Sequence, residues 1–205
     1  VNFALSRTTP AMVGVLTLGK EERIDLKIYE HHPTEGFPFR RHYFFDKTQE
    51  AKLVWNPKGK CVLIWAQSSV DKTGRSYYGE HELHFAKISE QRFKHVPTAE
   101  GPIYDVKWEP NGKHFIITSG FMPARTVMFN SDCEPVFEFG QHHRNTIRWN
   151  PFSRFLMIGG FGNLPGEMDF WDMTTKEKIG VGKASTAVSI EWGPDGRHLL
   201  TATLN

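Results

Sequence analysis

The sequence has 205 residues and a formal charge of +2, with 25 lysines and arginines against 23 aspartates and glutamates. This balance excludes a protein that binds nucleic acid through a broad basic surface. Two isolated cysteines, Cys61 and Cys133, form neither a disulfide framework nor a zinc site, and no apolar run is long enough to span a membrane. We therefore expect a folded protein of the reducing cytoplasm, with no metal, no cofactor and no membrane partner.

The first 50 residues contain four stretches with the alternating or apolar pattern of β-strands. They read FALSR, AMVGVLTLG, RIDLKIYE and FRRHYFF, at 3–7, 11–19, 23–30 and 39–45. Four consecutive strands could form one four-stranded sheet. No clear motif opens this segment, so it is the most weakly marked part of the chain.

A repeat organises the remainder of the sequence. Four stretches align without gaps: LVWNPKGKCVLI from Leu53, VKWEPNGKHFII from Val106, IRWNPFSRFLMI from Ile147 and IEWGPDGRHLLT from Ile190. Each reads apolar-x-Trp-x-Pro-x-(Gly/Ser)-(Lys/Arg) and predicts a strand, a turn and a returning strand, because proline fixes φ and glycine accepts the left-handed conformation. Ser153 replaces glycine in the third repeat, where we expect slight strain.

Each complete repeat continues with two further strands. The third strands are predicted at 82–88, 124–130 and 167–173, and the fourth strands at 92–96, 135–139 and 176–181. Four strands in roughly 40 residues are typical of β-propeller blades. Trp171-Asp172 falls where WD-repeat proteins place their tryptophan–aspartate pair. A β-sandwich is disfavoured, because sandwiches have no fixed period.

The predicted fold is therefore all-β, a β-propeller of WD40-like four-stranded blades. The blades are expected at about 1–50, 51–97, 102–141 and 144–183, with the start of a truncated blade at 187–205. Since HLLTATLN ends inside the second strand of a blade, we expect residues 1–205 to be an incomplete part of one larger propeller domain.

Several stretches suggest catalysis at first sight. Asp71 lies in DKTG, which resembles the phosphate-accepting tetrapeptide of ion-pumping ATPases, but it falls in an enlarged loop between two strands and lacks magnesium-binding aspartates. GGFGNLP (159–165) has no Gly-Lys-Ser/Thr and no following helix, which favours a tight inter-strand loop. The histidine pairs at 31–32 and 142–143 are interpreted as solvated loop residues, because neighbours on a strand point to opposite faces. We expect no catalytic or metal site.

Two patches combine cations with aromatic rings, as contacts to RNA phosphates and bases require. One is FRRHYFF, with Arg40 and Arg41. The other is the long loop at 68–81, with Lys72, Arg75, Tyr77 and Tyr78. The competing interpretation is an ordinary strand and a solvated loop.

The long loop and the repeats resemble the eukaryotic translation initiation factor 2A family, whose members are single-chain factors. The resemblance rests on SVDKTGRSYYGEHELHF, GPIYDVKWEPNG, GFMPARTVMFN, EPVFEFG, GFGNLPGEMDFWD and WGPDGRHLLTATLN, between about residues 53 and 205. It is weaker over 1–50.

This resemblance implies part of a nine-bladed propeller from a non-catalytic initiation factor. The implied partners are the small ribosomal subunit and initiator tRNA, and the implied activity is delivery of this tRNA without GTP. Further candidate partners are mRNA and other initiation factors. The alternative function is a protein-interaction scaffold, such as the propeller subunit of initiation factor 3.

Overall fold

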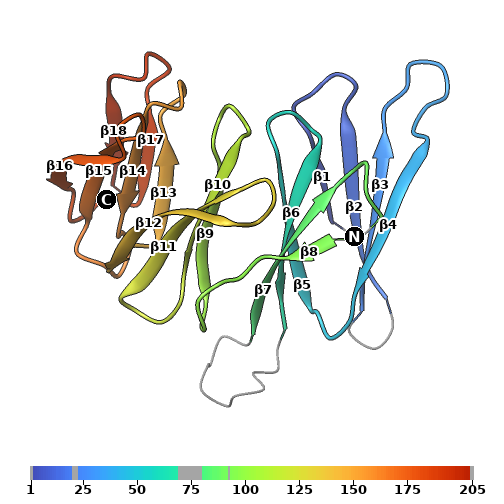
Figure 1. Cartoon of the computed structure of the whole chain (residues 1–205), viewed down its shortest axis with the longest axis horizontal. Helices are drawn as coiled ribbons and strands as arrows, with labels where there is room; N and C mark the ends of the chain where they lie inside the picture. The colour runs from blue at the N-terminus through green and yellow to red at the C-terminus, as the bar shows by residue number, and fades with distance from the viewer. Residues whose placement is uncertain (1, 20–22, 69–79, 92, 204–205) are drawn as a thin grey trace. The chain divides into compact units, whose positions relative to one another are not determined.

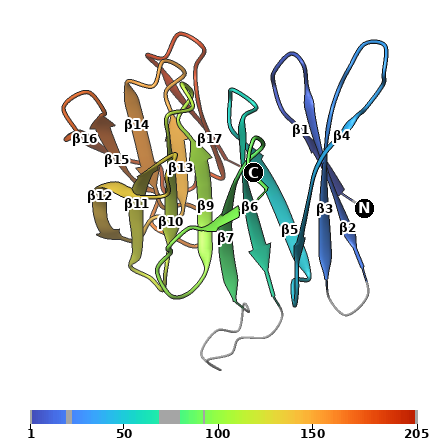
Figure 2. The ribbon, with the colours of Figure 1, turned by 45° about the vertical axis from the view of Figure 1, so that its right-hand side comes forward.

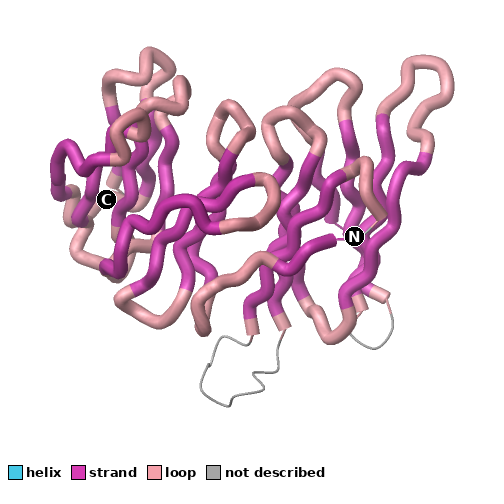
Figure 3. The backbone as a smooth tube through the Cα atoms, viewed as in Figure 1, coloured by secondary structure: helices cyan, strands magenta, loops and turns pink. Residues whose placement is uncertain are grey.

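The computed structural model describes residues 2–19, 23–68, 80–91 and 93–203. All regular elements in these ranges are β-strands, as Figures 1 and 3 show. The chain divides into two compact units, Val1–Pro102 and Ile103–Asn205. Within the described ranges no helix is long and apolar enough to cross a membrane.

The first unit consists of two four-stranded antiparallel sheets in which neighbouring strands are consecutive in sequence. The first sheet contains β1 (Asn2–Leu5), β2 (Met12–Leu18), β3 (Ile24–Glu30) and β4 (Phe39–Phe45). The second sheet contains β5 (Glu50–Trp55), β6 (Cys61–Gln67), β7 (His81–Lys87) and β8 (Phe93–His95).

The core of the first unit lies between these two sheets. Alternate residues of β2 and β3 point into it, and Leu26, Ile28, Val62 and Ile64 are fully buried. Burial of an aliphatic side chain of this size contributes roughly 1.5–3 kcal/mol. Gly14 allows close packing of the sheets, since a Cβ at this position would lie 2.5 Å from a methyl carbon of Leu53.

The second unit contains two four-stranded sheets and a two-stranded hairpin, all antiparallel. Its first sheet contains β9 (Ile103–Trp108), β10 (His114–Ser119), β11 (Ala124–Asn130) and β12 (Pro135–His142). Its second sheet contains β13 (Thr146–Trp149), β14 (Phe155–Gly159), β15 (Glu167–Asp172) and β16 (Glu177–Lys183). The hairpin pairs β17 (Ser189–Trp192) with β18 (Leu199–Ala202). Figure 2 shows the strands of the two four-stranded sheets of this unit.

The second unit has two hydrophobic layers. One joins the two four-stranded sheets and includes Ile116, Ile147 and Leu156, all fully buried. The other joins β14 and β15 to the β17–β18 hairpin and includes Met157 and Ile190. Strand β14 contributes to both layers because its successive side chains point to opposite faces.

The turn after each repeated tryptophan has the geometry expected from its sequence. The backbone N–H of Gly59, Gly112, Ser153 and Gly196 donates to the carbonyl three residues earlier at 2.8–3.0 Å. All four residues have left-handed φ values between 62° and 71°. Ser153 occupies a left-handed conformation that favours glycine, as the sequence predicts. Its hydroxyl accepts a hydrogen bond from the N–H of Asn111 at 3.2 Å, a contact that glycine could not make.

The predicted all-β class and the four-stranded antiparallel sheets are confirmed. The segment without a Trp-x-Pro motif also forms a complete sheet, β1–β4. The assignment of residues 1–205 to one continuous propeller domain, with the blade limits given above, stays a prediction.

Candidate functional site

Arg41 of β4 is held by backbone carbonyls of its own unit. Its Nε donates to Glu90 O at 3.2 Å, and its two terminal nitrogens donate to Ser89 O at 3.1 Å and Arg40 O at 2.8 Å. Glu90 and Ser89 follow β7, so the guanidinium joins the first sheet to the second. The hydroxyl of Tyr43 donates to the same Glu90 carbonyl at 2.9 Å. Arg41 therefore has a structural function in this unit.

Arg40 is more accessible than Arg41. Its side chain is 46% exposed and forms an ion pair with Glu30, with Nε 2.5 Å from Glu30 Oε2. An exposed ion pair of this kind contributes only about 0–1 kcal/mol. A phosphate could therefore displace Glu30 at little cost in stability.

Exposed aromatic rings lie on the same edge strand as Arg40. Phe39 and Phe44 are 55% and 51% exposed, and Arg23 stacks on the ring of Phe44 at 4.2 Å from its centroid. The ring Nε2 of His42 lies 2.8 Å from Asp25 Oδ1, within hydrogen-bond distance. Strand β4 thus carries the exposed Arg40 and two exposed rings, and its contact with RNA stays a prediction.

The second predicted patch lies outside the described residues. This applies to Lys72, Arg75, Tyr77 and Tyr78, and also to Asp71 of the DKTG tetrapeptide.

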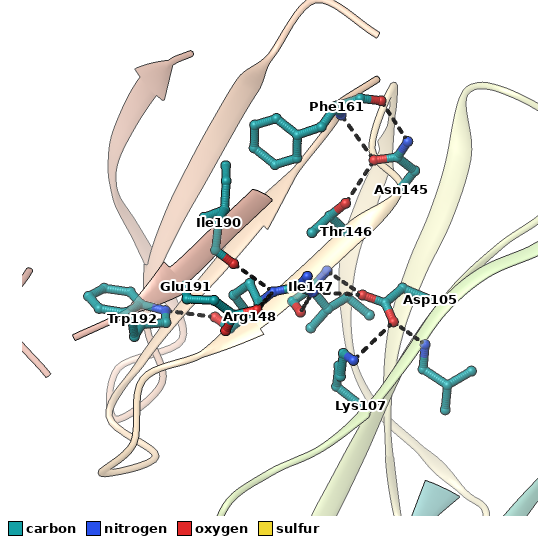
Figure 4. Close-up of polar contacts among 11 residues, drawn as sticks. Asp105, Lys107, Asn145, Thr146, Ile147, Arg148, Phe161, Ile190, Glu191 and Trp192 are labelled. Carbon is teal, nitrogen blue, oxygen red and sulfur yellow. Dashed lines mark hydrogen bonds and ion pairs between the residues drawn. The ribbon is translucent and has the colours of Figure 1, made fainter. Parts of the chain in front are cut away.

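A polar network on the first strands of the second unit was not predicted from the sequence. Asp105 of β9 accepts hydrogen bonds from the N–H of Val106 and from the N–H of Ile147 on β13, both at 2.9 Å. It also forms ion pairs with Lys107 at 3.7 Å and with Arg148 at 3.4 Å. Figure 4 shows this carboxylate between the two strands.

Arg148 extends the network to the hairpin. Its Nε donates to Ile190 O at 2.8 Å and to Glu191 Oε1 at 3.1 Å, and its own carbonyl accepts the indole N–H of Trp192 at 3.0 Å. Asp105, Arg148 and Glu191 therefore connect β9, β13 and β17 (Figure 4). The sequence signal for this network is a charged residue inside an otherwise largely apolar strand: Asp105 in β9, Arg148 in β13 and Glu191 in β17.

The glycine-rich segment at 159–165 is an inter-strand loop between β14 and β15. Asn145 fixes it by donating to Phe161 O at 2.9 Å and accepting from Phe161 N at 3.0 Å (Figure 4). A Cβ on Gly160 would lie 2.1 Å from the carbonyl oxygen of His143. The glycine thus serves close packing of backbone segments.

A histidine is buried between the two sheets of the first unit. His84 contacts the rings of Phe45 and Phe93, each with centroids 5.0 Å away, and its Nε2 lies 3.1 Å from Glu82. Its Nδ1 is buried without a hydrogen-bond partner among the described residues. Burial lowers the pKa of His84, with the nearby Glu82 opposing and His95 assisting.

Metal ligation finds no support in the part of the chain that the structure describes. No three histidine, cysteine, aspartate or glutamate side chains in these ranges gather around a point that could hold an ion.

Comparison with solved structures identifies the class of fold. A crystal structure described as that of the eukaryotic initiation factor matches 99% of this chain with a TM-score of 0.83 and 28% identity, and the chain covers 48% of it. The C-terminal WD40 domain of Sif2 matches 94% of the chain with a TM-score of 0.62, 15% identity and 51% coverage of that domain. The chain has the fold of WD40-type β-propeller proteins.

Sequence comparison identifies the family. The model of the family "Eukaryotic translation initiation factor eIF2A" matches residues 43–205. The chain therefore belongs to the eIF2A family. It is 42% identical to eukaryotic translation initiation factor 2A of Dictyostelium discoideum, over 80% of the chain and 27% of that protein. The Caenorhabditis elegans factor is 37% identical, over 86% of the chain and 31% of that protein. The chain thus spans less than a third of the length of these relatives.

Proposed function

We propose that the chain is part of a non-catalytic translation initiation factor of the cytoplasm. It would bind the small ribosomal subunit and support delivery of initiator tRNA without GTP, with mRNA and other initiation factors as further partners. The observation that carries this proposal is the eIF2A family match over residues 43–205. Rigid antiparallel sheets that display loops suit a docking platform.

The proposed RNA contacts are Arg40 and Arg41 in the first patch, and Lys72, Arg75, Tyr77 and Tyr78 in the second. The exposure of Arg40 and of the nearby Phe39 and Phe44 rings supports the first patch. Arg41 contributes by fixing the strand that carries Arg40.

The function is tested by retention of labelled initiator tRNA on purified small subunits in nucleotide-free buffer, with and without the protein. We expect protein-dependent retention that GTP does not increase, with an elongator tRNA as the control. Binding of the protein to subunits without retention of tRNA would restrict the function to docking. Absence of the protein from the subunit fraction would reject the proposal.

The patches are tested in the same assay with Arg40→Gln and with Lys72→Gln/Arg75→Gln. Each should weaken the binding of the protein to small subunits and reduce its salt dependence, because fewer counterions are released. The control is Lys47→Gln/Lys52→Gln, which removes two exposed cations that lie outside β4 and are not opposite it in the sheet. If all variants bind like the wild type, the patches do not contact RNA.

A scaffold that binds other initiation factors is the second candidate function. It is favoured by the similarity to a component of eukaryotic translation initiation factor 3 from Xenopus laevis, which is 28% identical over 75% of the chain and 23% of that protein. This function predicts that other initiation factors bound to the protein stay bound after nuclease treatment removes RNA.

A further inference from the structure

The connection between β3 and β4, residues 31–38, is longer than the equivalent connections of the second unit. The β11–β12 and β15–β16 connections also join the third strand of a sheet to the fourth, and they comprise only 131–134 and 173–176. Figure 1 shows residues 31–38, here named the β3–β4 hairpin, as a light blue loop that extends past the strands of its sheet at the top right. The shorter connections show that a sheet of this kind forms without the additional residues.

Local hydrogen bonds fix the conformation of the β3–β4 hairpin. His32 N donates to Gly36 O at 2.7 Å, and Gly36 N donates to His32 O at 3.0 Å. Gly36 has a φ of 76°, which glycine adopts without strain. The ring Nδ1 of His32 accepts the N–H of Glu35 at 3.3 Å and lies 3.1 Å from the hydroxyl oxygen of Thr34. The second histidine of the pair at 31–32 therefore stabilises the turn, and the surface of the hairpin is formed before any partner binds.

The hairpin and its base hold two pairs of aromatic rings at the surface. Phe37 is 57% exposed, and its ring centroid lies 5.3 Å from that of His31, which is also exposed. At the base, the exposed Phe39 pairs with Tyr29 across the two strands, with ring centroids 5.9 Å apart. Residues two apart on a strand point to the same face, so the two ring pairs follow each other on one face. A group of exposed rings of this kind marks an interaction site.

The β3–β4 hairpin carries one carboxylate and no lysine or arginine. Glu35 is the single charged residue among 31–38 at neutral pH. Its side chain is exposed, and it forms no ion pair with any residue that the structure describes. At the base of the hairpin, Glu30 is paired with Arg40. The exposed rings are therefore accompanied by one free negative charge at the tip.

We propose that the β3–β4 hairpin is a docking site for an extended segment of another protein. Apolar side chains of this segment pack on the rings of Phe37 and Phe39, and a lysine or arginine of the segment pairs with Glu35. Same-face residues of an extended chain lie roughly 7 Å apart, in the hairpin as in the ligand, so two alternate side chains of the segment meet the two ring pairs. The inference goes beyond the function proposed above, because the ligand is a protein and Arg40 is not required.

The composition of the hairpin favours a protein over RNA. Proteins that bind single-stranded RNA combine stacking rings with a positively charged groove, whereas residues 31–38 add a carboxylate to the rings. The centre of a protein interface is rich in aromatic side chains and poor in charge. A cation of the ligand is attracted both by Glu35 and by the face of a phenylalanine ring. Because the hairpin is already ordered, binding costs little conformational entropy on this side.

The experiment selects random peptides displayed on phage for binding to the wild-type protein. The enriched peptides are synthesised, and their Kd is measured for the wild type and for Phe37→Ser, Phe37→Leu and Glu35→Gln. The matched controls are Phe152→Ser and Glu177→Gln, which change an exposed phenylalanine and an exposed glutamate of the second unit. Thermal unfolding verifies that each variant is folded. Phe37→Leu keeps an apolar side chain and so separates the ring from apolarity alone.

We expect the enriched peptides to share apolar residues at alternate positions and a lysine or arginine. Phe37→Ser should weaken their binding by about tenfold or more, and Phe37→Leu should weaken it less. Glu35→Gln should weaken it by about two- to fivefold and reduce its dependence on salt. Both controls should bind like the wild type. If the wild type fails to bind small ribosomal subunits but binds the peptides through Phe37, the proposed function fails and this inference is supported.

Three results would overturn the inference. The first is a selection that enriches no peptide sequence. The second is binding of the enriched peptides to Phe37→Ser as tightly as to the wild type, or an equal loss in Phe152→Ser, because the hairpin would then not be the site. The third is a single-stranded RNA oligonucleotide that binds the wild type more tightly than any enriched peptide and loses affinity in Phe37→Ser, which would identify the rings as a stacking platform for bases.

Discussion

The indole of Trp192 donates its N–H to the backbone carbonyl of Arg148 at 3.0 Å, so the tryptophan of one repeat binds the first strand of the repeat before it. Trp55 makes the equivalent bond to Ala4 O in the first unit, also at 3.0 Å. Trp149 differs, because its buried indole N–H has no partner among the described residues. Trp55 and Trp192 therefore combine packing with a sheet-to-sheet hydrogen bond, which Trp149 does not make to any described residue.

This difference predicts unequal effects of the same substitution. Both Trp192→Phe and Trp149→Phe remove ring volume, but only Trp192→Phe removes a made hydrogen bond. We expect Trp192→Phe to lower the free energy of unfolding by about 0.5–1.5 kcal/mol more than Trp149→Phe. Urea unfolding followed by far-UV circular dichroism measures both. Equal losses would show that the bond contributes nothing.

The ion pair of Asp105 and Arg148 predicts energetic coupling between β9 and β13. The two side chains are mostly buried, at 16% and 24% exposure, and both also bond to backbone groups. We expect the double variant Asp105→Ala/Arg148→Ala to lose less stability than the sum of the single variants, by about 0.5–3 kcal/mol. A double-mutant cycle measures this difference. Strict additivity would mean that the two residues act independently.

Substitutions of Arg40 and Arg41 should differ in their effect on stability. Arg41→Ala leaves three carbonyl groups without their charged donor and should cost about 1.5–3 kcal/mol of stability. Arg40→Ala removes an exposed ion pair and should cost less than about 1 kcal/mol. Thermal unfolding of the two variants tests this order. A larger loss for Arg40→Ala would contradict the assigned functions.

His84 should make the first unit sensitive to acid. Because burial lowers the pKa of the folded histidine, the unfolded chain binds a proton first as pH falls below about 6.5. Stability should thus be constant above neutral pH and fall as pH drops through the unfolded pKa towards the lower folded one. Urea midpoints between pH 8 and pH 5 measure this fall, and His84→Gln should make the curve flatter. If the urea midpoints of the wild type and of His84→Gln fall equally with pH, His84 is not the cause of the acid sensitivity.

The strands and turns of the repeats could be predicted because their signals are local. Trp, Pro and Gly occur at fixed offsets, and β11 begins and ends where the pattern places it, at Ala124 and Asn130. The hydrogen bond that Ser153 Oγ accepts from the N–H of Asn111 could not be predicted, because Asn111 belongs to the turn of the preceding repeat. The same holds for Arg41, whose sequence neighbours suggest an RNA contact while its hydrogen bonds go to carbonyl groups 48 and 49 residues away.

The central claim is that these sheets dock on the small ribosomal subunit, and co-sedimentation with purified subunits across a potassium chloride series tests it most directly. The account predicts that the chain enters the subunit fraction at low salt and that log K falls linearly with log salt, because the cations of the proposed RNA contacts release counterions from RNA. A chain that stays in the supernatant at the lowest salt, or that binds with no salt dependence, would contradict the account.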